Sequence, residues 1–428
     1  MPLTEEVDRT RATFIDRIGI YPPLAWGYVG LLVFMIGDGV ESGYLSRYLV
    51  DRSFSEQGVA MVFTGYGLTA AVAAWLSGAL SDLWGPRRVM GVGLGIWVVF
   101  EVAFLLIGVA PDSYPMIFLF YALRGFGYPL FAFGFLVWVT AATPADRLGT
   151  AVGWFWFAFT GGLPTLGSLL ASYTVPRIGP YATLWLSLGL VLVGGLIALL
   201  GVREPTGRRR LAPPGEDPVA TLLSGVTIAW REPKIAIGCI VRVINTAPQF
   251  GFLVFLPIYF TEAVGFSLPQ WLRLLSLIFL SNIIWNLLFG VIGDRLGWRR
   301  TVALCGGLGS AISTLLLYYT PHLFGANFPL VALAGILYGA TLAGYVPLSA
   351  LMPSLTPDRK GAAMSMLNLG AGASVWVGPA LVALFLPRVG VAGVMWIFAV
   401  LYLLSSILAL FLTLPAVARS RDAAGTHA

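Results

Sequence analysis

Charged residues are scarce in this sequence. Asp, Glu, Lys and Arg make up 11% of its 428 residues, and hydrophobic residues make up 58%. A soluble domain usually carries about 25% charged residues, so a chain of this length cannot cover itself with a polar surface. We therefore predict a protein embedded in lipid. Its net charge of +6 then belongs to loops at the membrane surface, because no Lys and Arg stripe alternates with aromatic residues as in a nucleic-acid-binding face.

Histidine and cysteine are equally rare, with two residues of each. One histidine falls in a predicted outer loop and the other in the C-terminal tail, which excludes a Ser-His-Asp set in its usual form. Cys239 and Cys305 lie far apart, with neither metal-ligand spacing nor a disulfide pattern. The glycine clusters lie within apolar runs that no strand precedes, so they are not nucleotide-binding loops. We expect no enzyme activity, no cofactor and no metal.

Long apolar runs dominate what is present. Crossing about 30 Å of hydrocarbon takes about 20 apolar residues. Twelve such runs are separated by short polar breaks: 24–46, 57–80, 88–109, 114–140, 149–172, 180–201, 235–261, 270–293, 301–319, 328–352, 361–386 and 391–414. We predict an all-α membrane protein with two six-helix bundles, 1–201 and 235–428, joined by a cytoplasmic linker, 202–234. The second part of the linker is compatible with a short interfacial helix, with Trp230 at the headgroup level.

The Lys and Arg residues predict the orientation. If the N-terminus is cytoplasmic, most of the 26 basic residues fall in inner segments. The outer segments hold only Arg47, Arg52, Arg177, Arg273 and Arg388. The positive-inside rule then places both termini in the cytoplasm. The acidic N-terminal segment is unlike a cleaved signal peptide, so we expect the first span to be retained in a plasma (inner) membrane protein.

Two loops repeat one motif. "GALSDLWGPRR" begins at Gly78 and "GVIGDRLGWRR" at Gly290. The matching residues lie 212 positions apart: Gly78, Asp82, Gly85, Arg87 and Arg88 in the first loop, and Gly290, Asp294, Gly297, Arg299 and Arg300 in the second. "DRLG" at Asp146 and "DRKG" at Asp358 share this offset. We infer a duplicated six-helix unit, both copies in one orientation.

This loop motif resembles the signature of the major facilitator superfamily. The resemblance implies a transporter that works by alternating access, mostly as a monomer. It also implies that the acid and arginines of each loop form a cytoplasmic charge latch, which breaks as the two halves rock. The alternative is that these arginines only set the topology, and the two roles are compatible.

Several polar side chains interrupt the predicted spans, where each charge costs about 2.5–3.5 kcal/mol. Asp38 and Glu41 share one face of the first span, and Arg124 lies in the fourth. Arg242, Asn245 and Gln249 form one stripe of the seventh span. Amides also occur in the eighth and eleventh spans, at Asn282, Asn286 and Asn368. Glu101, in the third span, has no partner that the sequence identifies.

Two acids and two arginines at membrane depth can neutralise one another, and the amides supply donors and acceptors for hydroxyl groups. Such a set suits a neutral, hydroxyl-rich solute together with a proton. The alternative is a group of static ion pairs that only hold the helices together. Intramembrane ionisable groups are functional by default, which favours the first interpretation.

Further segments resemble the polyol permeases of the superfamily, the ribitol and D-arabinitol transporters. They include "GDGVE", "RGFGYPLF", "GWFWFAF", "RVINT" and "NIIWNLLFGVIGDRLGW", and the resemblance runs from about Leu24 to Pro415. It implies uptake of a linear sugar alcohol with a proton. Superfamily architecture places helices 1, 4, 7 and 10 around the central cavity. The implied proton-coupling residues are then Asp38, Glu41 and Arg124, and the implied substrate-binding stripe is Arg242, Asn245 and Gln249. Trp154, Tyr338 and Tyr345 are further candidates for contact with a polyol.

Two other cargoes stay open. A proton-coupled exporter of drugs or metabolites would suit a wide apolar cavity, although the buried amides and arginines favour a polar cargo. An organic-anion carrier is the other alternative, because Arg124 and Arg242 could clamp a carboxylate. The sequence does not identify the polyol or the acid that carries the proton.

Overall fold

The computed structural model describes residues 20–144, 148–211, 230–356 and 360–414, and this part of the chain folds into helices without strands. The elements of the first half are η1 (Pro22–Leu24), α2 (Ala25–Ser42), α3 (Leu45–Asp51), α4 (Glu56–Trp84), α5 (Pro86–Ala103), η2 (Phe104–Val109), α6 (Tyr114–Arg124), α7 (Gly127–Ala142), α8 (Leu148–Thr160), η4 (Gly161–Leu166), α9 (Gly167–Ile178) and α10 (Pro180–Gly201). A short turn, η5 (Pro205–Arg208), follows.

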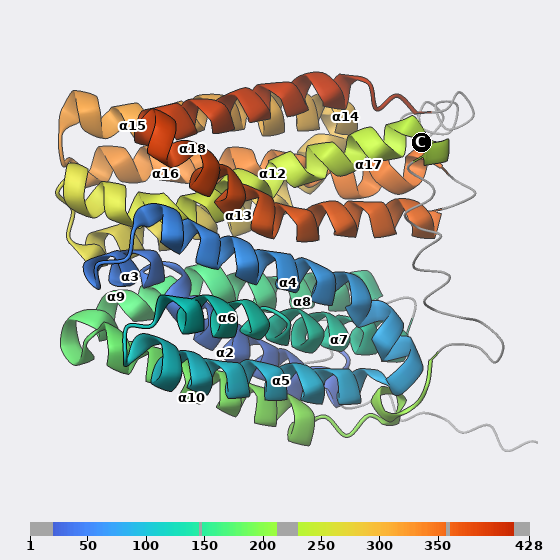
Figure 1. The fold of residues 1–428 in the computed structure, drawn as a ribbon. Coiled ribbons are helices and arrows are strands. Elements are labelled where there is room, and N and C mark those ends of the chain that lie inside the picture. Colours follow the sequence, from blue (N-terminus) through green and yellow to red (C-terminus); the bar gives the residue numbers. More distant parts are fainter. Residues whose placement is uncertain (1–19, 145–147, 212–229, 357–359, 415–428) are drawn as a thin grey trace, which may run out of the picture.

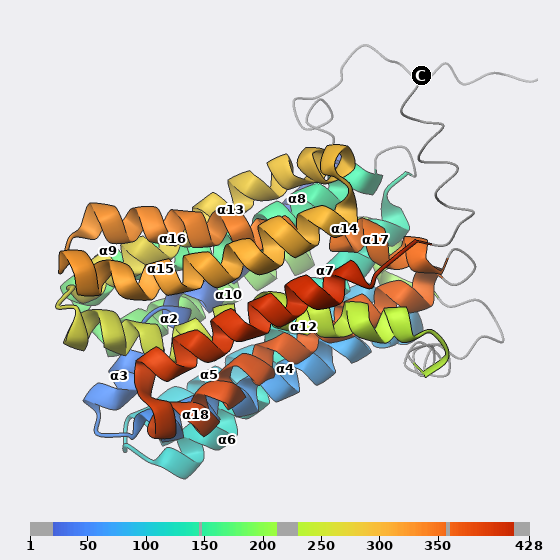
Figure 2. The ribbon, with the colours of Figure 1, turned by 90° about the horizontal axis from the view of Figure 1, so that it is seen from above.

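The second half begins with α12 (Pro233–Ile258). Its other elements are η6 (Tyr259–Ala263), α13 (Leu268–Leu296), α14 (Trp298–Thr301), η7 (Val302–Leu308), α15 (Gly309–Phe324), α16 (Phe328–Leu342), η8 (Ala343–Tyr345), α17 (Leu348–Leu355) and α18 (Lys360–Leu410). Figure 1 shows the helices of the first half, blue to green, beside those of the second, yellow to red. The helices run roughly parallel in both views, with α3 and α9 at one end and α14 and α17 at the other (Figures 1 and 2).

Ten segments of the described chain are long and apolar enough to cross a membrane. The last of them, Met366–Leu410, covers most of two predicted spans, 361–386 and 391–414, and the chain turns between them at Gly390, whose φ is 66°. Glycine is favoured there because this backbone region is strained for other residues. The predicted fifth span is also helical, over α8, η4 and α9, but it is not one of the ten. The twelve-span topology therefore stays a prediction.

Close helix crossings explain part of the high glycine content. A Cβ atom added to Gly39 of α2 would lie 1.7 Å from the backbone oxygen of Leu163 in η4. Pro164, next along η4, has no N–H for a regular α-helical bond, which accounts for the wider π-helical turn there. Small residues let transmembrane backbones approach closely, so this crossing fixes α2 against the fifth predicted span.

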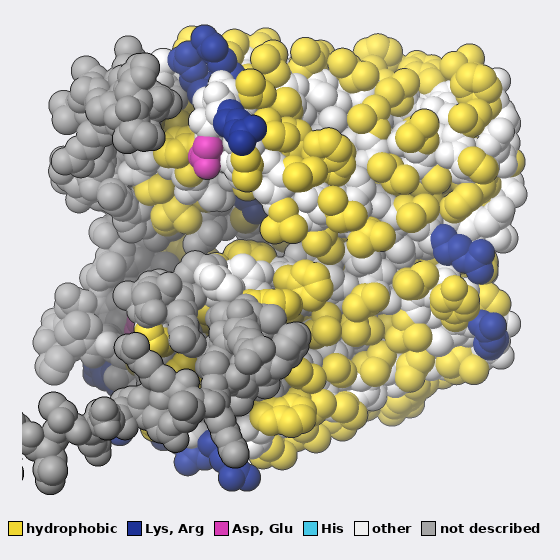
Figure 3. Space-filling model, turned by 180° about the vertical axis from the view of Figure 1, so that it is seen from behind, with side chains coloured by type: hydrophobic (Ala, Val, Ile, Leu, Met, Phe, Trp, Pro, Cys, Tyr) yellow, Lys and Arg dark blue, Asp and Glu magenta, His cyan; other side chains and the backbone are white. Residues whose placement is uncertain are grey.

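At the end that carries α3 and α9, the two halves are joined by hydrogen bonds that we call the outer seal, because the predicted orientation places this end outside. Ser46 Oγ donates to Leu253 O (3.0 Å), Trp271 Nε1 to Gly43 O (2.7 Å) and Ser276 Oγ to Thr165 O (3.1 Å). Arg47 Nη1 lies 2.5 Å from Glu262 Oε1. At the opposite end, Figure 3 shows a hollow between the halves.

The linker is partly described. The residues at its centre, 212–229, lie outside the described chain and with them most of the predicted interfacial helix. Trp230, at its far end, is 88% exposed. The near end is held to the first half, because Leu211 N donates to Asp82 O (3.0 Å).

Candidate functional site

Arg124 enters the core of the first half where the fourth predicted span is interrupted. Helix α6 ends at Arg124 and α7 begins at Gly127. The glycines of this break permit close contacts: a Cβ atom on Gly125 would lie 2.2 Å from Thr69 Oγ1, and one on Gly127 would lie 2.6 Å from Cβ of Trp97. The side chain of Arg124 is fully buried as a result.

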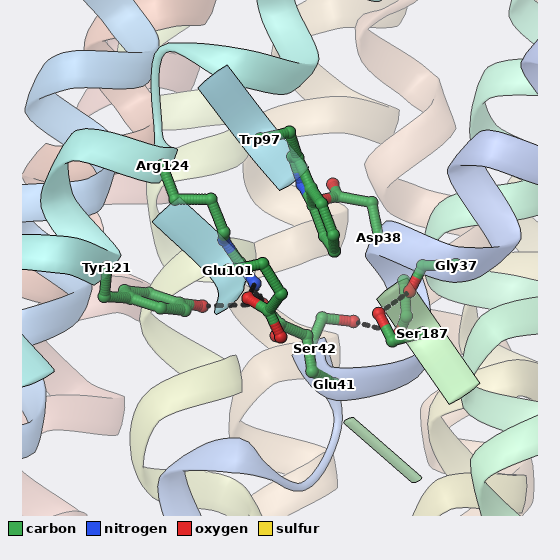
Figure 4. A network of polar contacts seen from close by, with 10 residues as sticks. Gly37, Asp38, Glu41, Ser42, Trp97, Glu101, Tyr121, Arg124 and Ser187 are labelled. Carbon is green, nitrogen blue, oxygen red and sulfur yellow. Dashed lines mark hydrogen bonds and ion pairs between the residues drawn. The ribbon is translucent and has the colours of Figure 1, made fainter. Parts of the chain in front are cut away.

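Two glutamates bind this guanidinium, and we call Glu41, Glu101 and Arg124 the charge triad (Figure 4). Arg124 Nη1 donates to Glu41 Oε2 (2.7 Å), and Nη2 contacts Glu41 Oε1, so the pair is bidentate. Nη1 also contacts Glu101 Oε2. Tyr121 OH adds a third donor to Glu41, at 3.1 Å from Oε1. Bidentate Arg–carboxylate pairs are strong and fix geometry, so α2, α5 and α6 are tied together here.

Aromatic rings enclose the guanidinium. Its carbon Cζ lies 4.5 Å from the ring centre of Tyr121, 4.8 Å from that of Trp97 and 5.3 Å from that of Tyr66. Cation–π attraction at such distances is strongest where water is excluded. The rings therefore stabilise the positive charge of Arg124 at a depth where water cannot.

The charge triad is not fully satisfied. Among the described residues, Glu101 Oε1 and Arg124 Nε are buried without a hydrogen-bond partner. One cation also faces two acids, which leaves the triad with an excess negative charge when both acids are ionised. Buried polar atoms without partners are rare in native proteins and often mark a site of exchange with a proton, water or ligand.

Asp38 is bound differently from its neighbour Glu41. Its Oδ1 accepts a hydrogen bond from Trp97 Nε1 (2.7 Å), and the residue is 4% exposed. Within the described structure it forms no ion pair with Arg124. Of the two acids predicted on this face of α2, only Glu41 pairs with the arginine. Trp97 was not among the predicted residues. It lies one helical turn before Glu101, and this spacing is the only signal in the sequence that could have pointed to it.

In the second half, Arg242 lies on α12 against α18. A Cβ atom on Gly370 would lie 3.1 Å from Cβ of Arg242, and two residues further Gly372 approaches Ala71 of α4. Arg242 is therefore close to where the halves meet. Its side chain is half-buried, and in the described chain it has neither a hydrogen bond nor an ion pair. The expected neutralisation among two acids and two arginines thus involves Arg124 and not Arg242.

The amides of the predicted stripe differ in exposure. Asn245 is 4% exposed, and its Oδ1 has no hydrogen-bond partner in the described structure. Gln249 is half-buried. On α13, Asn282 Nδ2 donates to Gly339 O (3.2 Å), and Asn286 Nδ2 donates to Asn282 Oδ1 (3.2 Å). Asn282 is thus held in place by α16, whereas Asn286 is half-buried and accessible.

The remaining candidates lie elsewhere. Tyr338 and Tyr345 share a face, as predicted, but their hydroxyl groups contact Tyr402 and Ser405 of α18 inside the second half. Asn368 is exposed on α18. Trp154 is half-buried on α8, with its ring 5.4 Å from that of Phe157. The two tyrosine hydroxyl groups are thus already bonded within the second half.

The two repeated loops have similar bonding. Arg87 Nη1 donates to Val202 O (3.3 Å), just after α10, and Arg299 Nη1 donates to Leu410 O (3.2 Å), at the end of α18. Asp294 accepts a hydrogen bond from Trp298 Nε1 (2.7 Å). In the part of the chain that is described, neither loop acid forms an ion pair with an arginine. The glycines of these loops turn the chain: Gly85 and Gly297 have φ of 85° and 88°, whereas Gly78 and Gly290 are helical.

Comparison with known proteins agrees with this architecture. The sequence profile of the Major Facilitator Superfamily matches residues 27–297 and 238–427. The chain belongs to the Major Facilitator Superfamily. Among superfamily transporters, the alpha-ketoglutarate permease of Bacillus subtilis is 46% identical over 94% of this chain and 92% of its own. The D-arabinitol transporter of Klebsiella pneumoniae is 38% identical over 92% and 93% of the two chains.

A solved structure supports the fold. The crystal structure of a mutant of the nucleoside transporter NupG superposes with a TM-score of 0.71. It covers 90% of this chain and 98% of its own at 17% sequence identity, so this likeness concerns the fold alone. The predicted resemblance to the superfamily and to its polyol permeases is confirmed, and the relatives are transporters and permeases, not enzymes. This is a multi-pass membrane transporter.

Proposed function

We propose that this protein is a secondary transporter that takes up a sugar alcohol, such as ribitol or D-arabinitol, together with a proton. The proposal includes two six-helix halves, both termini in the cytoplasm of a plasma (inner) membrane protein, and action as a monomer by alternating access. The similarity to a D-arabinitol transporter over nearly the whole chain supports the class of solute.

The observation that carries the proposal is the set of charges at the middle of the spans. Three acids, Asp38, Glu41 and Glu101, lie with Arg124 in the core of the first half, and a second arginine, Arg242, lies on α12 near where the halves meet. One added proton makes this set electrically neutral when the solute is uncharged. Because unbalanced charge in a membrane interior is costly, a neutral solute and one proton form a favourable combination for crossing.

Polar groups of the second half suit the solute. A polyol carries hydroxyl groups about every 2.5 Å, each a donor and an acceptor. Asn245 offers a buried acceptor that has no partner within the described residues, Arg242 offers donors, and Gln249 and Asn286 are accessible. We assign solute binding to these four residues and proton coupling to Asp38 and the charge triad.

The test is uptake by cells that express the protein. Radiolabelled ribitol, D-arabinitol, hexitols, sugars and organic acids are compared with and without a protonophore. We expect accumulation of a pentitol that the protonophore abolishes. Uptake that is unchanged by the protonophore would contradict proton coupling. Accumulation of an organic acid alone would contradict the assignment of a polyol as the solute.

Asn245→Ala tests the binding residue. Loss of one buried hydrogen bond costs about 1–3 kcal/mol, which is roughly a 5- to 150-fold weaker affinity. We expect polyol affinity to fall within this range while expression and membrane insertion stay normal. Tyr402→Phe is the matched control, because the Tyr402 hydroxyl contacts the backbone oxygen of Asn245 (3.2 Å) and the Tyr338 hydroxyl (2.8 Å) but not the side-chain amide of Asn245. Unchanged affinity in Asn245→Ala would remove this residue from the site.

A second candidate is an organic anion. The guanidinium of Arg242, unpaired among the described residues, favours it, and so does the similarity to an alpha-ketoglutarate permease. Arg124 is not available for this task, because two glutamates already bind it. Arg242→Gln separates the two cargoes: an anion carrier should lose transport, whereas a polyol carrier should lose one of several hydrogen bonds and retain measurable uptake.

A further inference from the structure

A second polar region lies away from the proposed solute site. A cavity of about 440 Å³ is lined by Arg87, Arg88, Gly91, Leu199 and Arg208. It lies where the start of α5, the end of α10 and the turn η5 meet. The basic residues of the chain predict that this end faces the cytoplasm. Three guanidinium groups therefore converge at the boundary between lipid and cytoplasm.

The fold holds Arg208 in this position. Glu204 accepts a hydrogen bond from Trp138 Nε1 (2.6 Å) and caps η5 through the backbone N–H of Thr206 (3.0 Å). Gly207 packs so tightly on Trp138 that a Cβ atom would lie 2.2 Å from its ring. The backbone bond from Leu211 to Asp82 fixes the other side of the turn. Contacts of the residues before and after Arg208 thus fix its position in the chain.

The three arginines have no anionic partner among the described residues, where none of them forms an ion pair. Arg87 donates one N–H to the backbone oxygen of Val202. The nearest acid of η5, Glu204, is occupied by Trp138 and Thr206. Guanidinium groups recognise phosphate by paired hydrogen bonds, so an anion with several oxygens would satisfy them.

Two glycines leave an open strip on the surface of α5 beside the cavity, and we call this strip the groove. Gly91 and Gly95 lie one helical turn apart, and a Cβ atom at either would meet open space. Neither glycine is required for a close helix contact, although glycine costs about 1 kcal/mol in a helix interior. Val92 and Val99 are exposed on the same helix. The groove offers room for a hydrocarbon chain beside the cationic cavity.

We propose that this cavity binds the phosphate of an anionic phospholipid, with an acyl chain along the Gly91–Gly95 face of α5. Basic pockets between transmembrane helices on the cytoplasmic side are suited to such headgroups. A free phosphate ion shares the chemistry of the headgroup but makes no use of the groove. The lipid would bridge α5, α10 and the start of the linker, and so hold the linker against the first half.

The test uses the purified full-length protein in detergent. Phosphatidylglycerol, phosphatidylcholine and inorganic phosphate are titrated separately, and binding is measured by native mass spectrometry and by the shift in unfolding temperature. We expect phosphatidylglycerol to bind and stabilise more than phosphatidylcholine. Arg208→Gln should weaken its binding about fivefold, the effect typical of one basic residue near a membrane surface.

Two variants make the outcome decisive. Arg210→Gln removes the same charge from the same linker but does not line the cavity, and it should bind phosphatidylglycerol as the unmodified protein does. Gly95→Leu fills the groove and should weaken lipid binding without changing the arginines. Equal effects of Arg208→Gln and Arg210→Gln, or equal binding of the two lipids, would overturn the proposal. Stabilisation by inorganic phosphate with no preference for the anionic lipid would overturn the assignment to a lipid.

Discussion

At the scale of single residues, the two glutamates bound to Arg124 are unequal. Glu41 receives a bidentate pair and the Tyr121 hydroxyl, whereas Glu101 has one oxygen in contact with Arg124 and one without a partner among the described residues. Removal of either acid leaves a one-to-one pair, but removal of the arginine leaves two buried carboxylates together. The three residues should therefore respond very differently to neutral substitutions.

Arg124→Gln should lower the free energy of unfolding by about 3–5 kcal/mol, the range found when a buried charge loses its partner. Glu101→Gln should change it by about 1 kcal/mol or less, because the bidentate pair with Glu41 stays intact. Unfolding in detergent, followed by tryptophan fluorescence against denaturant concentration, measures both. Similar losses in the two variants would contradict this ranking.

Asp38→Asn should abolish proton-driven accumulation of the solute. Within the described structure, Asp38 is the acid of the set that has no arginine paired with it, and it retains a small exposed area. Exchange of labelled for unlabelled solute across the membrane, which needs no net proton movement, should continue. Glu41→Gln, measured in the same two assays, is the comparison. A mutant at Asp38 that still concentrates solute against its gradient would move the coupling role to another acid.

At the scale of elements, the crossing of α2 and η4 depends on a glycine. Gly39→Ala would place a carbon inside the backbone of Leu163, and we expect a loss of several kcal/mol or failure to fold. Gly189→Ala on α10 meets open space and should be neutral or stabilising by up to about 1 kcal/mol. Yield of folded protein and unfolding temperature test the pair. Equal effects of Gly39→Ala and Gly189→Ala would show that α2 and η4 can move apart without loss of stability.

The apolar runs alone placed most helices, because about 20 lipid-compatible residues are needed wherever a helix spans. They also predicted a break between the last two spans, and the structure places a turn at Gly390 there. They did not reveal the partner of Glu101, since the faces of α5 and α6 that meet depend on the glycines at their crossing. The i, i+7 spacing of Tyr338 and Tyr345 predicts that they share a face. It does not predict what this face packs against, which is α18.

The choice between Asp38 and Glu41 was beyond the sequence for a related reason. Both acids project from the same face of α2, so either could have met Arg124. The position of Trp97 on α5 selects between them, because its indole N–H donates a hydrogen bond to Asp38. Glu41 is the acid that pairs with Arg124. Partner choice inside a bundle is thus set by side chains of a third helix, which no spacing within one helix encodes.

At the scale of the whole molecule, the two halves are joined at the end of the outer seal, which the proposed orientation places outside, and apart at the other end (Figure 3). Arg47 forms ion pairs with two carboxylates. Asp51, at 2.8 Å, belongs to its own helix, whereas Glu262, at 2.5 Å, belongs to the other half. Of these two ion pairs, only the one with Glu262 must break for this end to open.

Glu262→Gln should therefore shift the transporter toward the outward-open state. The contact is partly exposed and is worth about 1 kcal/mol at most, so we expect up to a roughly fivefold change in the population of the two states. Asp51→Asn removes a similar charge without touching the join and is the control. The opening is measured by labelling the variant Gln249→Cys from outside, in a protein that lacks Cys239 and Cys305. Equal labelling in the two variants would contradict a role for Glu262.

The outer seal also bears on how the sequence can drift over evolutionary time. In each of its three neutral hydrogen bonds a side chain of one half donates to a backbone oxygen of the other. Substitution at Leu253 or Thr165 leaves the acceptor in place, since every residue has a carbonyl group. Substitution of the donors Ser46, Trp271 or Ser276 removes the bond. Descendants of this chain can therefore change the acceptor residues without losing these hydrogen bonds, whereas the donors, which come from both halves, must be kept for the outer seal to form.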